Sequence, residues 1–149
     1  MRLLLFYIEG SRYAVPAEAV GEIVRAVAVT GLPGAPSVVD GVIDVRGTIV
    51  PLFSLRRRFG LRDRGVEPAD QFIVVRTPSR TAALHVDHAE DLIEVDRRAI
   101  ADPSRQMAGT PLIGGVALLD DGLALIYDVD TFLSRAESDA LDAAMASRR

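Results

Sequence analysis

The chain of 149 residues contains no cysteine, no lysine, no asparagine and no tryptophan. Without cysteine it can form no disulfide bond, no thiolate metal site and no cysteine nucleophile. Aromatic side chains make up only 5% of the residues, so the core must be largely aliphatic. All 17 basic residues are arginine. Because lysine and asparagine codons are AT-rich, this bias indicates a GC-rich genome more than a special chemistry.

The chain also lacks an excess of positive charge and any long apolar run. Its net charge of −4 argues against nucleic acid as the main partner. No apolar run approaches the roughly 20 residues of a membrane span, so we expect no insertion into a membrane. The apolar start of the chain stops at Glu9 and has no small-residue cleavage pattern, which favours a strand over a signal peptide. We therefore expect a cytoplasmic protein.

Short β-type segments separated by turn signals fill most of the sequence. Many short strands at regular spacing predict an all-β barrel or sandwich. A helical turn should begin at Pro16, and a β-branched strand should follow at residues 22–29. Three hairpins are expected, from residues 3–8 with 12–15, 71–76 with 81–86, and 113–119 with 123–127.

The end of the chain has a helical pattern. Ser134 and Glu137 have the spacing of a capping box, and a helix should occupy residues 134–147. We expect its apolar stripe to dock on the β-structure rather than to bind a partner as a free helix. The stripe consists of Phe132, Leu133, Ala136, Ala140, Leu141, Ala144 and Met145.

The most informative segment is residues 41–61, GVIDVRGTIVPLFSLRRRFGL. Two β-type runs, 42–45 and 48–53, are joined by Arg46-Gly47, where glycine supplies a turn conformation that other residues resist. Pro51 in the second run favours a sheet edge or a strand end, because proline donates no ladder hydrogen bond. Arginine at an exposed turn is a good recognition group, since it offers five donors in a planar fork.

This segment resembles the central motif of the CheW-type chemotaxis coupling proteins. The residues in matching places are Gly41, Arg46, Gly47, Ile49, Pro51 and Leu55, whereas Asp44, Val45 and Ser54 replace the usual Asn, Leu and Asp. Further segments resemble the family in the same order, so that the resemblance covers essentially the whole chain. They are residues 6–15, 20–23, 30–36, 84–87 and 114–133.

The resemblance implies an all-β fold of two small five-stranded SH3-like β-barrel subdomains, packed side by side, with a C-terminal helix. The first subdomain would span residues 12–70 approximately and the second 71–133, allowing an exchange of the N-terminal strand. The loop at 101–111 departs from the family, because it holds Arg105-Gln106-Met107 in place of a Pro-rich, Phe-containing sequence.

The implied function is that of a non-enzymatic adaptor without a cofactor. It would join the cytoplasmic tips of chemoreceptors to the regulatory domain of the histidine kinase CheA, in receptor arrays at the inner membrane. The family's receptor contacts map to Val20, Glu22, Gly41, Arg46 and Gly47, with Asp44 beside them, and its kinase contacts map to Val29, Thr30 and Ile49. For the apolar residues Val20, Val29 and Ile49, plain core packing is the alternative. Asp44 and Arg46 should project to one face and form an ion pair.

A small ligand-binding or enzymatic β-barrel is the alternative function, but no nucleophile–base pair can be named. The carboxylates at residues 120–130 suit turns and caps better than a calcium loop. His85 should point away from its apolar neighbours, and with His88 it lacks a third ligand for zinc, so we expect no metal site. Arg56, Arg57 and Arg58, with Arg62 and Arg64, favour a solvated helical turn over a contact for an acidic partner.

Overall fold

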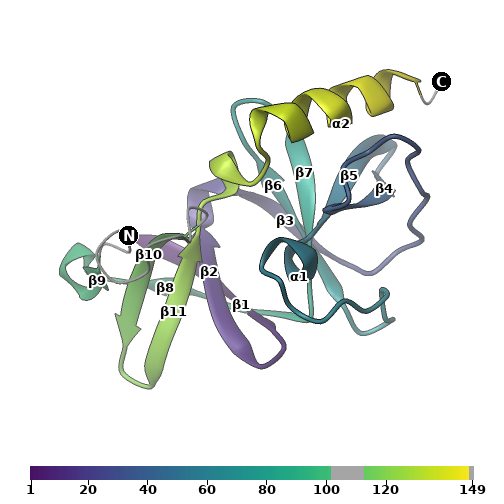
Figure 1. Cartoon of the computed structure of the whole chain (residues 1–149). Helices are drawn as coiled ribbons and strands as arrows, with labels where there is room; N and C mark the ends of the chain where they lie inside the picture. Colours follow the sequence, from purple (N-terminus) through teal and green to yellow (C-terminus); the bar gives the residue numbers. More distant parts are fainter. Residues whose placement is uncertain (102–112, 148–149) are drawn as a thin grey trace.

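The computed structural model describes residues 1–101 and 113–147, which form two sheets and a C-terminal helix (Figure 1). The six-stranded sheet has the order β8-β1-β2-β11-β10-β9, and the five-stranded sheet has the order β3-β6-β7-β5-β4. The predicted all-β class with a C-terminal helix is confirmed.

The six-stranded sheet contains β1 (Arg2–Ile8), β2 (Ser11–Pro16), β8 (His88–Glu94), β9 (Ile100–Ala101), β10 (Ile113–Leu119) and β11 (Gly122–Tyr127). The five-stranded sheet contains β3 (Val20–Arg25), β4 (Val39–Val45), β5 (Thr48–Ser54), β6 (Gln71–Arg76) and β7 (Thr81–Val86). The helices are α1 (Leu55–Arg58) and α2 (Arg135–Ser147), and 3₁₀ turns occupy η1 (Ala17–Ala19), η2 (Arg97–Ala99) and η4 (Val129–Thr131).

The two sheets interleave along the chain. Strands β1 and β2 lie in one sheet with β8 to β11, because β2 pairs in parallel with β11, from Leu125 opposite Tyr13 to Ile126 opposite Ala14. Strands β6 and β7, which the predicted limits placed in the second subdomain, pair with strands of the first half, since β7 lies parallel to β5. The three predicted hairpins are all present.

Two predicted strand features differ from the structure. The strand expected at residues 22–29 ends at Arg25. The last backbone hydrogen bond on this side runs from Ala26 N–H to the Asp70 carbonyl, and beyond it the chain turns away from β6. Pro51 lies in an interior strand rather than at an edge. It sits opposite Val42 of β4 and just before the first residue of β5 that pairs with β7, so its missing N–H breaks no ladder bond there.

One apolar core is shared by both sheets and by the C-terminal segment. Phe6 and Tyr13 from the six-stranded sheet meet Ile73 and Leu84 from the five-stranded sheet, together with Phe132. Smaller clusters fill the remaining side of each sheet. The two sheets are therefore halves of one packed body and not independent units.

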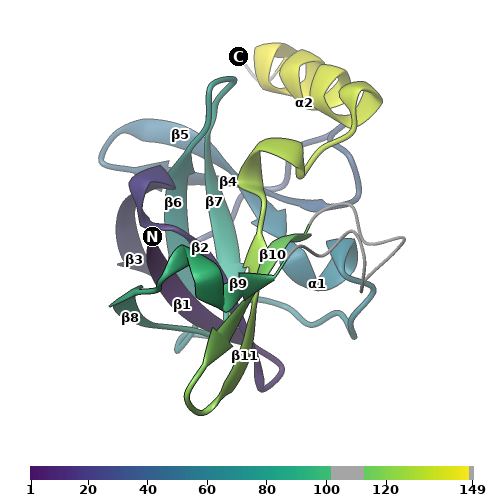
Figure 2. The ribbon, with the colours of Figure 1, turned by 90° about the vertical axis from the view of Figure 1, so that its left-hand side faces the viewer.

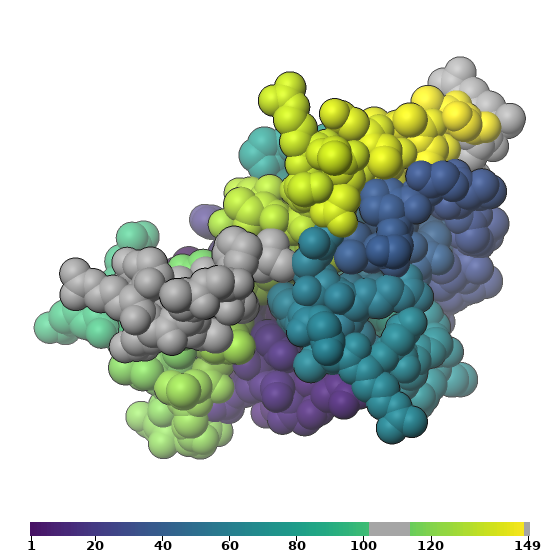
Figure 3. All heavy atoms as spheres, viewed as in Figure 1, coloured from purple at the N-terminus to yellow at the C-terminus, as the bar shows by residue number. Residues whose placement is uncertain are grey.

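Helix α2 lies over one end of the five-stranded sheet, beside β6 and β7 (Figures 1 and 2). The predicted capping box is formed, with Glu137 N–H donating to Ser134 Oγ and Ser134 N–H donating to Glu137 Oε1. Leu141 and Ala144 are buried in the shared core, and Figure 3 shows the helix against the segment that precedes β4. The predicted docking of the helix is confirmed.

Candidate functional site

The predicted recognition turn is the exposed tip of the β4–β5 hairpin. Arg46 has φ 52° and Gly47 has φ 86°, so both residues adopt the left-handed conformation that a two-residue hairpin turn requires. The Arg46 side chain is 83% exposed. Gly47 N–H donates to Asp44 Oδ1 over 2.7 Å, so Asp44 fixes the turn from the strand before it.

Arg46 forms its ion pair with Glu22 of β3, at 2.9 Å between Nη2 and Oε2. The predicted pair of Asp44 with Arg46 is therefore wrong. The Asp44 carboxylate is bonded to the turn backbone, and the left-handed backbone at Arg46 directs the long side chain toward β3 instead. Two of the predicted receptor residues, Glu22 and Arg46, are thus brought together from positions 24 apart in the sequence.

Gly41 allows a close approach between β4 and the segment after β3. A Cβ atom at Gly41, whose φ is 150°, would lie 2.3 Å from the Thr30 carbonyl oxygen and 2.9 Å from Cγ1 of Val29. This space lets Thr30 form a β-bridge with Val42, with N–H···O distances of 2.9 and 2.8 Å. A predicted receptor residue therefore touches two predicted kinase residues.

The three remaining apolar residues among those predicted are half-buried. Val20 and Ile49 pack against the shared core, whereas Val29 packs against a separate cluster around Ile43 and Phe72. Thr30 is exposed. The structure therefore groups Thr30 with Val29, but it places Ile49 against a different apolar cluster, directly opposite Asp44 in the β4–β5 register.

A groove of about 370 Å³ lies between the two sheets, next to Val20. Pro16, Glu18 and Ala19 form one wall at the η1 turn, and Arg76 and Pro78 extend the wall along the β6–β7 hairpin. Asp128 and its neighbours after β11 form the opposite wall. Val20 itself is turned into the core and does not line this groove.

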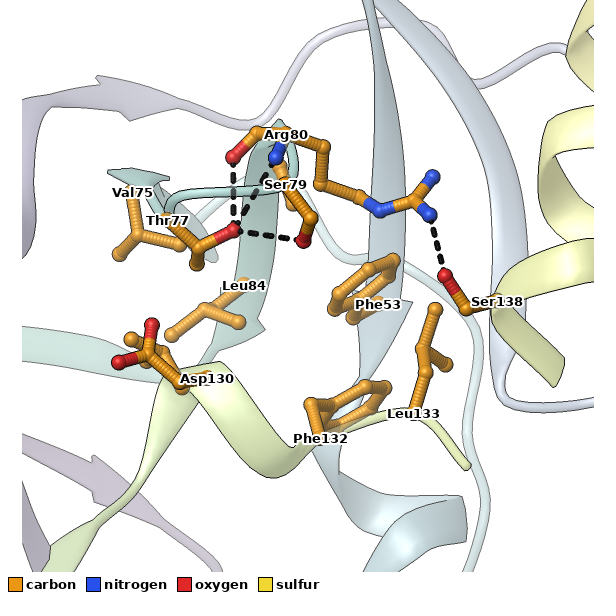
Figure 4. A pocket seen from close by; sticks show the side chains of 12 residues that line it. Phe53, Val75, Thr77, Ser79, Arg80, Leu84, Asp130, Phe132, Leu133 and Ser138 are labelled. Atoms are coloured by element: carbon orange, nitrogen blue, oxygen red, sulfur yellow. Dashed lines mark hydrogen bonds between the residues drawn. The ribbon is translucent and has the colours of Figure 1, made fainter. Parts of the chain in front are cut away.

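A second pocket lies beneath the start of α2 (Figure 4). Apolar side chains, including Phe53, Leu84 and Phe132, form its floor. The polar groups at its rim bond to one another, since Thr77 Oγ1 donates to the Arg80 carbonyl and Arg80 donates to Ser138 Oγ over 2.7 Å. The pocket therefore presents apolar surface and satisfied polar groups rather than a set of reactive side chains.

The arginine cluster was predicted as a solvated turn, and this prediction is wrong for Arg56, although Arg57 and Arg62 are exposed. Arg56 is only 3% exposed, and it forms ion pairs with Glu9 and Asp87. Arg57 pairs with Asp40 and Asp63, Arg58 with Glu137, and Arg64 with Asp70 and Asp87. These arginines belong to internal ion pairs and do not form a free basic surface.

His85 is also buried, at 5% exposure, between two carboxylates. Its Nε2 lies 2.6 Å from Asp70 Oδ2 and its Nδ1 lies 3.6 Å from Asp40 Oδ2. Burial alone would lower the pKa of His85, but its bonds to Asp40 and Asp70 outweigh burial and raise the pKa above the ordinary histidine value. Burial would likewise raise the pKa of Asp70, yet Arg64 and His85 hold that pKa far below its usual range.

Among the acidic residues near the end of the chain, Asp128 caps a turn, as predicted, because its Oδ1 accepts from the N–H of Asp130 at the start of η4. Asp121 instead forms an ion pair with Arg12 over 2.9 Å. Within residues 1–101 and 113–147, no three acidic or histidine side chains converge as metal ligands. No helix in these ranges is long and apolar enough to cross a bilayer.

The described residues form two interleaved β-sheets with a docked C-terminal helix and an exposed arginine turn, the architecture of a small β-rich domain. Residues 2–137 match the family described as CheW-like domain, and the chain belongs to that family. The predicted membership and the predicted class of chemotaxis scaffold are confirmed. The divergent loop lies outside the described residues, except for Ala101 at the end of β9.

Relatives of known identity agree with this assignment. The chain is 29% identical to the chemotaxis protein CheW of Helicobacter pylori over 136 residues, covering 91% of this chain and 82% of that protein. It is 25% identical to the chemotaxis protein CheW of Treponema pallidum over 142 residues, covering 91% and 84%. The crystal structure of the scaffolding protein TtCheW of Thermoanaerobacter tengcongensis matches with a TM-score of 0.83 at 27% identity, covering 91% of this chain and 94% of that one.

Proposed function

We propose that this protein couples the cytoplasmic tips of chemoreceptors to the regulatory domain of the histidine kinase CheA. It would work on the cytoplasmic side of the inner membrane, within receptor arrays. The observation that carries the proposal is the Arg46–Gly47 turn, which presents an 83% exposed guanidinium beside Glu22 at the surface of a CheW-like domain. An exposed charge pair of this kind suits the polar rim of a protein interface.

The receptor face would be built around Glu22, Arg46 and the groove between the sheets. Glu22 and Arg46 neutralise each other in the free protein, yet each keeps hydrogen-bonding capacity for polar groups of a receptor helix. Asp44 and Gly47 would contribute by holding the turn, and Gly41 by holding the strand beneath it. Val20 would act through the core that supports the groove rather than by contact.

The kinase face would be built around Thr30, which is exposed, with Val29 beside it and Ile49 as apolar support. The exposed side chains of Ile23 and Val27, at 40% and 44%, lie on the same part of the chain and would add apolar area. Apolar area at the centre with polar groups around it is the composition that protein interfaces favour.

Calorimetric titration of the whole chain tests the proposal. One titration uses a CheA regulatory domain, another uses a soluble receptor-tip fragment, and a third adds the receptor fragment to the preformed adaptor–kinase complex. We expect binding in each titration, including the third, because a coupling protein must hold both partners at the same time. Failure to bind either fragment alone would overturn the proposed function.

A further inference from the structure

A set of charges around one buried arginine joins the two sheets, and neither predicted binding face contains it. Its centre is Arg56, which α1 carries directly after β5 of the five-stranded sheet. The guanidinium donates from Nη2 to both carboxylate oxygens of Asp87, at 2.6 and 2.7 Å, and from Nη1 to Glu9. Arg64 adds a second cation, 2.9 Å from Asp87 Oδ1, so that two arginines face two carboxylates.

The partners of Arg56 lie where the sheets are connected. Asp87 is the single residue between β7 of the five-stranded sheet and β8 of the six-stranded sheet. Glu9 lies in the β1–β2 turn of the six-stranded sheet, and its N–H donates to Asp87 Oδ2 over 2.9 Å. Asp87 N–H in turn donates to the Tyr7 carbonyl of β1. A side chain from one sheet is thus bonded to the other sheet and to the crossover between them.

The shared apolar core does not by itself fix the angle between the two sheets. Burial of apolar area is non-directional, and it tolerates small rotations of one sheet against the other. Asp87 and Glu9 accept from different nitrogens of one planar guanidinium, so the positions of both carboxylates are set relative to the same plane. Buried ion pairs add little net stability over apolar packing, and their best use is to specify one arrangement among several.

We propose that Arg56 is a positioning residue that clamps the crossover at Asp87 and the turn at Glu9, and so fixes the orientation of the six-stranded sheet against the five-stranded sheet. The second part of the proposal rests on the proposed function. A scaffold transmits a receptor's state to a kinase through its own rigidity, so loosening this clamp should impair activation more than binding.

The neighbouring Arg57 provides a matched control. It lies on the same helix and also forms two ion pairs, but its partners Asp40 and Asp63 belong to β4 and to the loop after α1. Its remaining bond, from Nη1 to the Ser37 carbonyl over 2.7 Å, stays beside β4. Arg57 therefore shares the helix and the number of carboxylate partners with Arg56, although it is more exposed, and it lacks the connection to the six-stranded sheet.

The test measures the distance between the sheets by double electron–electron resonance on the full chain. Since the chain has no cysteine, Arg76→Cys on β6 and Leu118→Cys on β10 give one exposed spin-label site in each sheet. We expect a single narrow distance distribution in the parent and in Arg57→Met, and a broadened or second distribution in Arg56→Met. If Arg56→Met does not fold, Glu9→Gln replaces it, because this change removes only the partner in the six-stranded sheet.

If the distance distribution of Arg56→Met matches that of the parent, the proposal is overturned, because the apolar core alone would then hold the angle between the two sheets. In a reconstituted receptor–kinase assay, we expect Arg56→Met to bind each fragment like the parent but to lose receptor-dependent activation, and Arg57→Met to retain it. Equal activation by both variants would refute the second part. Absence of fragment binding by the parent itself would instead count against the proposed function and leave the distance result standing.

Discussion

Glu22 and Arg46 form an ion pair at 2.9 Å although they belong to opposite ends of the five-stranded sheet. Glu22 lies on β3, the first strand in the sheet order, and Arg46 follows β4, the last. The pair therefore spans the seam where the sheet curls back on itself. With the bridge between Thr30 and Val42, it is one of the contacts that close this seam.

Replacement of the turn arginine should separate binding from folding. We expect Arg46→Ala to weaken receptor-fragment binding by about 1–4 kcal/mol, the usual cost of losing an interface arginine. The free energy of unfolding should fall by less than about 1 kcal/mol, because an exposed ion pair contributes little. Calorimetry and urea denaturation measure the two effects. Arg97→Ala, an exposed arginine in η2, is the control, and an equal loss of binding there would refute the role of Arg46.

Asp44 should act through its oxygen and not through its charge. Since Oδ1 accepts from Gly47 N–H, we expect Asp44→Asn to leave the free energy of unfolding and the receptor affinity unchanged at both low and high salt. Asp44→Ala removes the acceptor and should cost about 0.5–1.5 kcal/mol of stability. Urea denaturation of the parent, Asp44→Asn and Asp44→Ala gives the free energies of unfolding to be compared. A salt-dependent gain of receptor affinity in Asp44→Asn would show that the charge matters after all.

Gly41 should be intolerant of any side chain. A Cβ would overlap the Thr30 carbonyl at 2.3 Å, so we expect Gly41→Ala to lower the free energy of unfolding by on the order of 2–3 kcal/mol. Gly31→Ala is the matched control, because its Cβ would meet no atom within 4 Å. Thermal unfolding of both variants gives the comparison. Similar melting temperatures for Gly41→Ala and Gly31→Ala would mean that β4 and the segment at Thr30 can move apart at no cost.

The exposed Thr30 offers the clearest test of the kinase face. We expect Thr30→Asp to weaken binding of the CheA regulatory domain, because a carboxylate buried at an interface without a partner is strongly unfavourable. Its melting temperature should stay near that of the parent, whereas Val29→Asp should also lose stability because Val29 packs against Ile43 and its neighbours. Unchanged kinase affinity in Thr30→Asp would move the kinase face elsewhere.

His85 should make stability depend on pH. Its pKa is raised in the folded protein, so protonated His85 stabilises the fold fully below the unfolded pKa of about 6.5. This contribution is lost as the pH rises through the folded pKa. We therefore expect the parent to lose stability from about pH 6.5 upward, compared with His85→Gln, in urea denaturation at a series of pH values. Parallel profiles for the parent and His85→Gln would contradict the assignment.

Local chemistry explains which parts of the fold could be predicted from the sequence. Glu9-Gly10 and Arg46-Gly47 both form left-handed turns, and such turns have short-range signals. The capping box at Ser134 is equally local. The parallel pairing of β2 with β11 has no such signal, because the two strands are more than 100 residues apart.

The candidate site shows the same limit. The exposure of Arg46 followed from its turn, but its partner Glu22 is on another strand. Arg56 was misjudged because Glu9 and Asp87, which bury its charge, are 47 and 31 residues away. In the sequence, internal neutralisation of these charges is indicated only by the acidic residues Asp63, Glu67 and Asp70 that follow the run of arginines.

The interleaving of the sheets has a consequence for the order of events during synthesis. Strands β1 and β2 leave the ribosome before the other described strands, yet the edge of β2 has its partner only when β11 has been made. The five-stranded sheet, whose strands are contiguous from β3 to β7, can assemble earlier. Until then the apolar faces of β1 and β2 have only each other and the growing five-stranded sheet to pack against. The nascent chain should therefore depend on chaperones longest at β1 and β2.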